Sequence, residues 1–511
     1  MIRTFLRTLG VAFIVVVASG HVGSPDTWFD GNAGPYQVVV QIQQAGVVPG
    51  VAKVFVRVSG GRPESVTIQA NRFDASGGAP PPEPTTPSAS DPGLYSGQLW
   101  MMTSGSNSVT VNVAGQEGKG SVVVPVVINA YTRLGLAAPM GIGLSAMGLF
   151  LFVGLVTIMG AAVREGPLEP GQAATDKTRK RARIAMALTS VILVALLAGG
   201  WRWWNSDDAE YERSMYKPLA STASLEDGKG GRVLVVSIAD SAWVHRSDTA
   251  WLRRNDRPSW TPLVEDHGKL MHVFVISEDQ SSFAHLHPES KDSAVFMSDA
   301  PPLPSGKYRV FADIVHESGF THTLVSSLDV PATSASLPVA TRDPDDSWLV
   351  AAKPNTTTAA TLGDGTTIRW DRTGDLVAGN PVPLRFEVRN SDGSPAALEP
   401  YMGMAGHAVV ERSDGSVFVH LHPMGTISMA SQMAFTMRNE GDSIRGRLGR
   451  RVSEAEMSAM SHATVQSNTV SFPYAFPKEG AYRVWVQVKR DGKVLTGVFD
   501  TNVVRASAGD S

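Results

Sequence analysis

Twelve histidines occur in this 511-residue chain, and half of them fall in two short segments with identical spacing. The segments align without gaps at an offset of 135 residues and contain His272, His285 and His287 in the first, and His407, His420 and His422 in the second. Imidazole is a common protein ligand for copper and zinc. Three imidazoles that converge in each segment could bind a metal ion, so the sequence predicts a duplicated metal site.

Each segment has the pattern of a β-hairpin that would bring its histidines together. In the second segment Asp414-Gly415 is a favoured two-residue turn. The resulting register sets His407 opposite His422, where Cβ atoms lie roughly 5 Å apart. His420 is two residues from His422 and therefore points to the same face. The first segment has the same register about Asp279-Gln280, so its three histidines should converge in the same way.

Residues near the two segments differ in type and predict different sites. The first segment is accompanied by His267, Met271, His316 and His322, and the second by Met402, Met404 and Met424. Thioether sulfur is a soft ligand that favours Cu(I). We therefore expect a histidine-rich site in the first segment and a mixed histidine and methionine site in the second, with copper as the metal and zinc as the alternative. Structural histidines and a pH-sensing cluster remain open as other interpretations.

The composition narrows the chemistry. The chain has no cysteine, which removes disulfides, thiolate-ligated zinc, iron–sulfur clusters, thiol catalysis and the blue-copper centre. It carries 45 Lys and Arg against 48 Asp and Glu, and this near-neutral balance argues against a nucleic-acid partner. The sequence contains no phosphate-binding loop, Rossmann fingerprint or HExxH motif, so nucleotide and hydrolase functions are not expected.

Three apolar stretches predict how the chain meets a membrane. Residues 1–20 have the basic start, short apolar run and small final residues of a signal peptide. Residues 134–163 and 184–204 are apolar enough for two transmembrane helices, and the loop 164–183 between them ends in a cluster of Lys and Arg. The positive-inside rule makes this loop cytoplasmic. We therefore expect a protein of the bacterial cytoplasmic membrane whose N- and C-terminal domains are both periplasmic.

The remaining sequence has the short Val-rich runs and frequent turn residues of β-sandwiches. We expect an N-terminal sandwich at 21–133, a first repeat at 231–332 and a second repeat at 360–505, joined by linkers at 205–230 and 333–359. The second repeat contains a Met-rich insertion of 39 residues that begins near Met424. The predicted fold is mainly β, with three immunoglobulin- or cupredoxin-like sandwiches outside the membrane and two transmembrane helices.

Three stretches resemble a known family. They are HGKLMHVFVISEDQSSFAHLHP at 267–288, YMGMAGHAVV with FVHLHPMG between 401 and 425, and GKYRVFADIVHESG at 306–319. These stretches resemble bacterial extracytoplasmic proteins with YtkA-like domains, which are immunoglobulin-like or cupredoxin-like sandwiches associated with copper handling. The resemblance implies copper trafficking or tolerance and assigns no ligand.

Three functions are therefore open. The leading hypothesis is a membrane-anchored metal-binding protein, not an enzyme, that stores or transfers copper or confers tolerance to it. A His-x-His pair with a nearby Met on a β-sandwich is also similar to the site of copper monooxygenases, which makes a copper-dependent oxidoreductase the first alternative. The second alternative is an immunoglobulin-like scaffold with structural histidines that binds a membrane or periplasmic protein partner.

Overall fold

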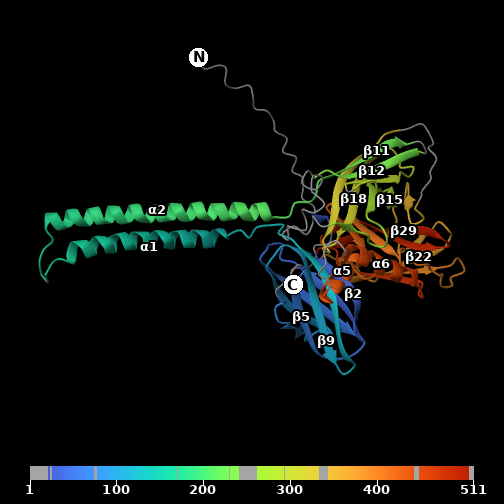
Figure 1. The fold of residues 1–511 in the computed structure, drawn as a ribbon, viewed down its shortest axis with the longest axis horizontal. Coiled ribbons are helices and arrows are strands. Elements are labelled where there is room, and N and C mark those ends of the chain that lie inside the picture. The colour runs from blue at the N-terminus through green and yellow to red at the C-terminus, as the bar shows by residue number, and fades with distance from the viewer. Residues whose placement is uncertain are drawn as a thin grey trace, which may run out of the picture. The chain divides into compact units, whose positions relative to one another are not determined.

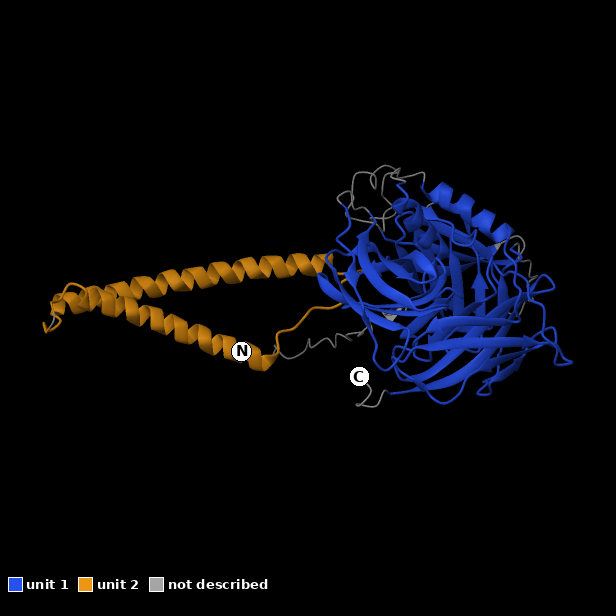
Figure 2. Ribbon diagram, turned by 90° about the horizontal axis from the view of Figure 1, so that it is seen from below, with its two compact units in different colours: residues 1–128, 218–511 blue, residues 129–217 orange. Residues whose placement is uncertain are grey.

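The computed structural model describes residues 21–22, 26–73, 78–169, 171–228, 231–240, 262–292, 294–332, 343–441 and 448–505. Strands account for 45% of the residues and helices for 21%, which confirms the expected mainly-β fold. Figure 1 shows these strands and helices along the chain. The expected signal peptide, residues 1–20, lies outside the described residues. The chain divides into two compact units (Figure 2), a helical unit at 129–217 and a β unit formed by the rest.

The helical unit contains two long apolar helices, α1 (Ala138–Glu165) and α2 (Asp176–Ser214). Thr175 caps α2, because its hydroxyl oxygen accepts a hydrogen bond from the backbone N–H of Thr178 at 3.3 Å. The helices approach closely at Gly160, where an added β-carbon would lie 2.6 Å from the sulfur of Met186. Both helices are long and apolar enough to cross a membrane.

The helix ends differ from the predicted boundaries. The stretch 205–230 is not a linker, because α2 continues to Ser214 and a strand, β11 (Ser221–Gly228), follows it. Ion pairs hold this end of α2, with Arg133 at 3.1 Å from Asp208 and 3.0 Å from Glu212. The basic cluster predicted in the loop 164–183 lies instead in the first turns of α2, since that helix starts at Asp176.

The N-terminal module is a sandwich of two antiparallel sheets. One sheet has the order β2 (Asp26–Ala33), β3 (Tyr36–Gln43), β4 (Gly50–Ser59), β8 (Leu94–Met101) and β7 (Thr86–Pro87). The other has the order β10 (Gly118–Ile128), β9 (Gly105–Gly115), β5 (Pro63–Arg72) and β6 (Glu83–Pro84). The Pro-rich β6 and β7 lie at sheet edges, where proline is tolerated because no partner needs its missing N–H.

Each repeat is a sandwich of a four-stranded sheet and a six-stranded sheet. The small sheet of the first repeat has the order β11, β12 (Gly231–Ile238), β17 (Val295–Asp299) and β16 (Glu289–Ser290). Its large sheet has the order β13 (Leu263–Val264), β18 (Gly306–His316), β14 (His272–Ser277), β15 (Phe283–Leu286) and β20 (Ser347–Leu349), and β19 (Thr321–Val330) also pairs with β18. The predicted linker 333–359 thus contributes a strand to this sheet.

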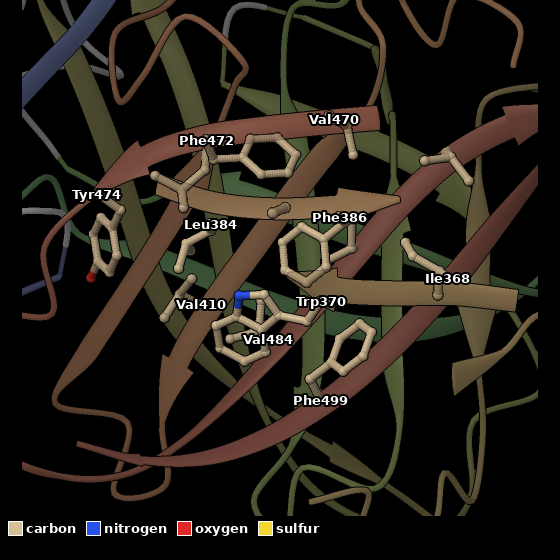
Figure 3. Packing of buried hydrophobic residues seen from close by; sticks show 14 of the residues in the cluster. Ile368, Trp370, Leu384, Phe386, Val410, Val470, Phe472, Tyr474, Val484 and Phe499 are labelled. Atoms are coloured by element: carbon tan, nitrogen blue, oxygen red, sulfur yellow. The ribbon is translucent and has the colours of Figure 1, made fainter. Parts of the chain in front are cut away.

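The second repeat has the same plan. Its small sheet has the order β21 (Ala359–Thr361), β22 (Thr367–Asp371), β24 (Val382–Arg389) and β27 (Thr469–Tyr474). Its large sheet has the order β1 (His21–Val22), β26 (Val417–Leu421), β25 (His407–Arg412), β28 (Gly480–Arg490), β29 (Lys493–Val504) and β23 (Leu376–Val377). Strand β28 pairs with β25 and β29 as β18 pairs with β14 and β19, which supports the internal duplication. Trp370, Phe386 and Phe499 pack in the core of this repeat (Figure 3).

The large sheets of the two repeats pack against each other through aromatic side chains. Phe311 stacks on Phe418 with ring centroids 3.9 Å apart, and Trp485 stacks on Phe283 at 5.1 Å. Phe311 aligns with Trp485, and Phe418 with Phe283, in the duplicated sequence. Equivalent residues therefore exchange places across the interface, as in a two-fold symmetric dimer. We call this contact, which also includes Phe274, the repeat interface.

The Met-rich insertion of the second repeat forms helices α5 (Met429–Asn439) and α6 (Leu448–Ser461), which pack against the first repeat. Val452 of α6 and Ala434 of α5 lie in one apolar cluster with Val315. The N-terminal sandwich contacts the loop that begins the insertion. There the backbone N–H of Asp30 donates to the carbonyl oxygen of Met424 at 2.8 Å. The N-terminal sandwich therefore meets the start of the insertion two residues after His422.

Candidate metal centre

Seven histidines from both repeats converge at one end of the repeat interface. Their ring centroids lie 4.5 to 6.4 Å from neighbouring rings in the group, which consists of His267, His272, His285, His287, His407, His420 and His422. Every member is buried, and the most exposed, His420, has an exposed fraction of 9%. We call this group the histidine cluster. The sequence predicted two separate sites, whereas the structure brings them together.

The hairpin register explains why each segment directs its histidines to this end. Phe274 pairs with His285 in the first hairpin, and Val409 pairs with His420 in the second, which confirms the predicted register. Alternation along β14 puts His272 on the same face as Phe274, and that face forms the repeat interface. The histidines lie at the ends of the hairpins remote from the turns. When the large sheets of the two repeats pack together, the histidines of the first hairpin therefore come next to those of the second.

Two equivalent hydrogen bonds cross the repeat interface. His285 Nδ1 lies 2.9 Å from Gln487 Oε1, and His420 Nδ1 lies 3.3 Å from Asp313 Oδ2. Asp313 and Gln487 align with each other at an offset of 174 residues. Each repeat therefore orients a histidine of the other, with an amide on one side and a carboxylate on the other. Burial raises the pKa of the Asp313 carboxyl to about 7.

Further hydrogen bonds define which ring nitrogens carry hydrogen. A carbonyl oxygen can only accept, so His272 Nε2, 3.0 Å from the carbonyl oxygen of Asp266, is the protonated nitrogen of its ring. His287 Nδ1 donates to Asp346 Oδ1 at 2.9 Å, and His422 Nδ1 donates to the carbonyl oxygen of Ile427 at 3.0 Å. The remaining nitrogen of each neutral ring then carries a lone pair.

The first-repeat histidines direct these lone pairs toward each other. His285 Nδ1 donates to Gln487, which leaves Nε2 as an acceptor, and this Nε2 lies 3.3 Å from the unprotonated Nδ1 of His272. His287 Nε2 is buried and has no hydrogen-bond partner among the described residues. Buried acceptors that face each other without a donor are unfavourable unless a cation lies among them. This arrangement could hold a metal ion.

Other cluster nitrogens are also buried without a hydrogen-bond partner in the described part of the chain. They are both ring nitrogens of His267 and of His407, and Nε2 of His420 and of His422. Burial lowers the pKa of the His267, His272 and His422 rings to about 4. The same desolvation lowers the pKa of the other four rings well below the usual value. Neutral imidazoles bind metal ions without competition from protons near pH 7.

Two groups of three histidines have ligand atoms close enough to hold one ion each. Triad A consists of His267, His407 and His422, and triad B of His272, His285 and His287, and in each the three nitrogens lie within 4.8 Å of one another. His287 also lies within this distance of carboxylate oxygens of Asp343 and Asp346. Burial, together with the nearby Asp343 charge, raises the pKa of Asp346 to about 7.

Three predicted ligands lie outside the cluster. Met271 is fully buried in the apolar core of the first repeat, because it precedes His272 and alternation turns it to the opposite face. His316 and His322 contact each other, with ring centroids 5.3 Å apart. His316 shares a strand face with Ile314, which lies in that same apolar core, so the pair is directed away from the repeat interface.

The predicted methionines lie around the cluster. Met402 occupies the turn equivalent to that of His267, with φ of 50° against 56°, and is 5% exposed. Met404 closes this turn through backbone hydrogen bonds with Tyr401, and Met424 lies in the loop that contacts Asp30. The structure brings their backbones near the cluster, and the described contacts give no ring contact for their sulfur atoms.

Sequence reasoning missed several groups around the cluster. Met460 of α6 lies against both turns, since β-carbons added at Gly268 and Gly403 would lie 3.3 and 2.6 Å from its side chain. The oxygen of Glu456 accepts a hydrogen bond from the backbone N–H of His267 at 3.0 Å. Burial and the nearby Asp266 raise the pKa of this carboxyl. No sequence signal identifies these groups, because the fold of the insertion brings them to the cluster.

Comparisons with known proteins leave the function open. Residues 234–332 and 359–505 match a family model described as a domain of unknown function, DUF8832, which spans both repeats. No curated protein matches the chain. Similar solved structures include an engineered protein at 19% identity, which covers 18% of this chain and 20% of that one with a TM-score of 0.15. A Salmonella alpha-2-macroglobulin reacted with methylamine, at 8% identity, covers 94% of this chain and 23% of that one with a TM-score of 0.19. The chain thus spans about a quarter or less of their lengths, and such TM-scores define neither fold nor function.

Proposed function

We propose that this protein binds a transition metal in the histidine cluster and stores or transfers it at a membrane surface. One observation carries the proposal. The unprotonated nitrogens of His272 and His285 lie 3.3 Å apart in a buried site, and the partnerless Nε2 of His287 belongs to the same triad. A hydrogen-bonded structural cluster would place a donor against each acceptor. A bound cation accounts for all three lone pairs at once.

Copper is the metal that suits the ligands best. Imidazole binds copper and zinc alike, but thioethers are soft and favour Cu(I). Met402 and Met460 lie at the two turns beside His267. Methionines at these turns, beside a cysteine-free imidazole cluster, would offer Cu(I) soft ligands that zinc does not need.

Burial of the cluster favours storage or transfer over catalysis. The cluster histidines are at most 9% exposed. An oxidoreductase needs a coordination position that its substrate can reach. A buried cluster suits an ion that is held and then handed on. The copper-dependent oxidoreductase is therefore the weaker alternative, and a scaffold with purely structural histidines leaves the facing lone pairs unexplained.

The proposed location follows from the charge of the segment between α1 and α2. The residues from Lys177 to Arg183 are basic except for Thr178 and Ala182. If both helices span the membrane, the positive-inside rule puts this segment in the cytoplasm. Both parts of the β unit would then be periplasmic. The chain has no cysteine, so Ser90→Cys, Gln172→Cys and Lys493→Cys each provide a unique thiol. In intact cells, an impermeant maleimide should label the Ser90→Cys and Lys493→Cys variants. Labelling of the Gln172→Cys variant alone would overturn this topology.

Metal binding is tested on the full chain in detergent. The protein is stripped with a chelator and dialysed against Cu(I) under reductant, Cu(II) or Zn(II), and the bound metal is measured by mass spectrometry. The variant in which His285, His287, His420 and His422 are all replaced by Asn is compared with His462→Asn, which changes an exposed histidine of the same chain. Wild-type protein and the control should retain metal, with copper held most tightly. Uptake no greater than in the fourfold variant would end the proposal, and metal-independent melting with a co-purified partner would favour a scaffold.

A further inference from the structure

The histidine cluster contains two complete sets of ligands rather than one. Triad A and triad B share no residue, and each brings three ring nitrogens within 4.8 Å of one another. Three imidazoles supply three of the four ligands of a tetrahedral site. We infer that the cluster holds two metal ions, one in each triad, and that the ion in triad A joins the two repeats. This inference rests on the proposed metal binding.

Triad A is assembled across the repeat interface. His267 comes from the first repeat, whereas His407 and His422 come from the second. The His267 ring lies closer to those rings, with centroids at 5.5 and 5.0 Å, than to His272 of its own repeat at 6.2 Å. Its equivalent in the second repeat is Met402. The two-fold relation is therefore broken at this position, and the two sites differ in their ligands.

All three histidines of triad B come from the first repeat, and one of them, His287, is oriented by a carboxylate. Asp346 accepts from both the backbone N–H and Nδ1 of His287, at 2.8 and 2.9 Å. Carboxylates that bind the remote nitrogen of a ligating histidine define its tautomer and raise its basicity. Triad A has no such carboxylate on His422, whose Nδ1 donates to a backbone carbonyl. The two sites should therefore differ in affinity.

The two triads are in contact, and acidic groups surround them. Ring centroids of His285 and His407 are 6.4 Å apart, which connects one triad with the other. His420 belongs to neither triad but contacts members of both, at 5.6 Å from His272 and 4.5 Å from His422. Buried cations require nearby negative charge. Four carboxyl groups lie beside the cluster and could compensate bound cations once deprotonated, those of Asp266, Asp313, Asp346 and Glu456.

A matched pair of variants separates the two sites. His287 and His422 are equivalent in the duplication, and each donates from Nδ1 while Nε2 has no partner among the described residues. An Asn side chain places its amide nitrogen near the position of Nδ1 and has no counterpart of Nε2. His287→Asn and His422→Asn therefore keep the structural hydrogen bond and delete one ligand from triad B or triad A. His462→Asn is the control.

The experiment measures stoichiometry and magnetic coupling in the full chain in detergent, loaded with Cu(II). Wild type and His462→Asn should bind two equivalents, each single variant one, and the double variant none. Two nearby Cu(II) ions should give an electron paramagnetic resonance signal below two equivalents or broadened by coupling, whereas each single variant should give one isolated signal. One equivalent in wild type, lost in either single variant, would overturn the inference but leave metal binding intact. No bound copper or zinc in wild type would instead refute the proposed function.

Discussion

Phe418 packs in the repeat interface, two residues before His420 of the histidine cluster, so its removal tests whether the cluster depends on contact between the repeats. The side chain is 1% exposed and stacks on Phe311 at 3.9 Å with the ring planes 8° apart. Replacing a buried Phe by Ala costs about 3–5 kcal/mol, to which the lost aromatic pair contributes about 0.5–1.5 kcal/mol. We expect Phe418→Ala to lower the stability of the metal-free protein by about this amount.

The more informative expectation concerns metal affinity. Triad A takes ligands from both repeats, so loosening the repeat interface should weaken metal binding at least tenfold, which corresponds to about 1.4 kcal/mol. Phe386→Ala is the matched control, because Phe386 is fully buried in the internal core of the second repeat. It should cost similar stability and leave the affinity of the folded protein within about threefold of wild type. Phe418→Leu serves if the alanine variant does not fold.

The assay combines thermal unfolding of the full chain in detergent with competitive titration of copper against a chromophoric chelator. If Phe418→Ala is destabilised but binds copper as tightly as wild type, the packing of the two repeats does not hold the ligands in place. If Phe386→Ala loses affinity to the same extent, the effect reports general loosening of the second repeat. Either result would refute the reasoning that the repeat interface positions the cluster.

Three further predictions follow from single contacts and from burial. Asp346→Asn removes the charge beside His287 and should weaken metal binding about 10- to 100-fold without changing the stoichiometry, as measured by the same titration. The pKa of His267, His272 and His422 is about 4 in the folded protein and about 6.5 when unfolded, so the unfolded chain binds more protons between these values. The contribution of these three rings to the free energy of unfolding should therefore fall by up to about 4 kcal/mol per pH unit as the pH drops from 6.5 toward 4. The carboxyls of Asp313 and Asp346 contribute with the opposite sign, because their pKa is raised to about 7 in the folded protein. An NMR titration of the metal-free protein in which the three rings protonate near pH 6.5 would contradict their burial. Gly425→Ala would place a β-carbon 2.1 Å from the carbonyl oxygen of Trp28 at a φ of 119° and should release the N-terminal sandwich to limited proteolysis. Gly441→Ala, at a φ of 100° with open space around it, should not.

The sequence predicted local features of the repeats well, because they depend on residues close in sequence. The hairpin about Asp414-Gly415 and the alternation that puts His420 and His422 on one face follow from turn chemistry and a two-residue period. The same alternation also indicates that Met271 faces away from His272, so the two residues are not ligands of one site. Adjacent residues on a strand point to opposite faces, so a residue next to a ligand in sequence does not belong to the same site.

The merging of the two sites could not be predicted in the same way. Both faces of β14 carry apolar residues, such as Val273 on one and Phe274 on the other, so the pattern does not distinguish the inner core from the repeat interface. A signal did exist in the aligned Asp313 and Gln487. Each is a polar residue in an apolar strand at an equivalent position, which indicates a polar partner on the facing surface. The arrangement of α6 had no such signal.

Keeping both repeats in one chain has a chemical consequence for the cluster. In a homodimer every residue at the interface occurs twice, so a His267 equivalent would be present on both sides and the two sites would be identical. Here one copy has His267 where the other has Met402, and one has Asp313 where the other has Gln487. The covalent connection also holds the two halves at high effective concentration, so triad A forms without association of two molecules. A two-fold interface within one chain can thus carry two adjacent sites with different ligands. Because different ligands give different affinities, an ion in the weaker site would be drawn to the stronger one.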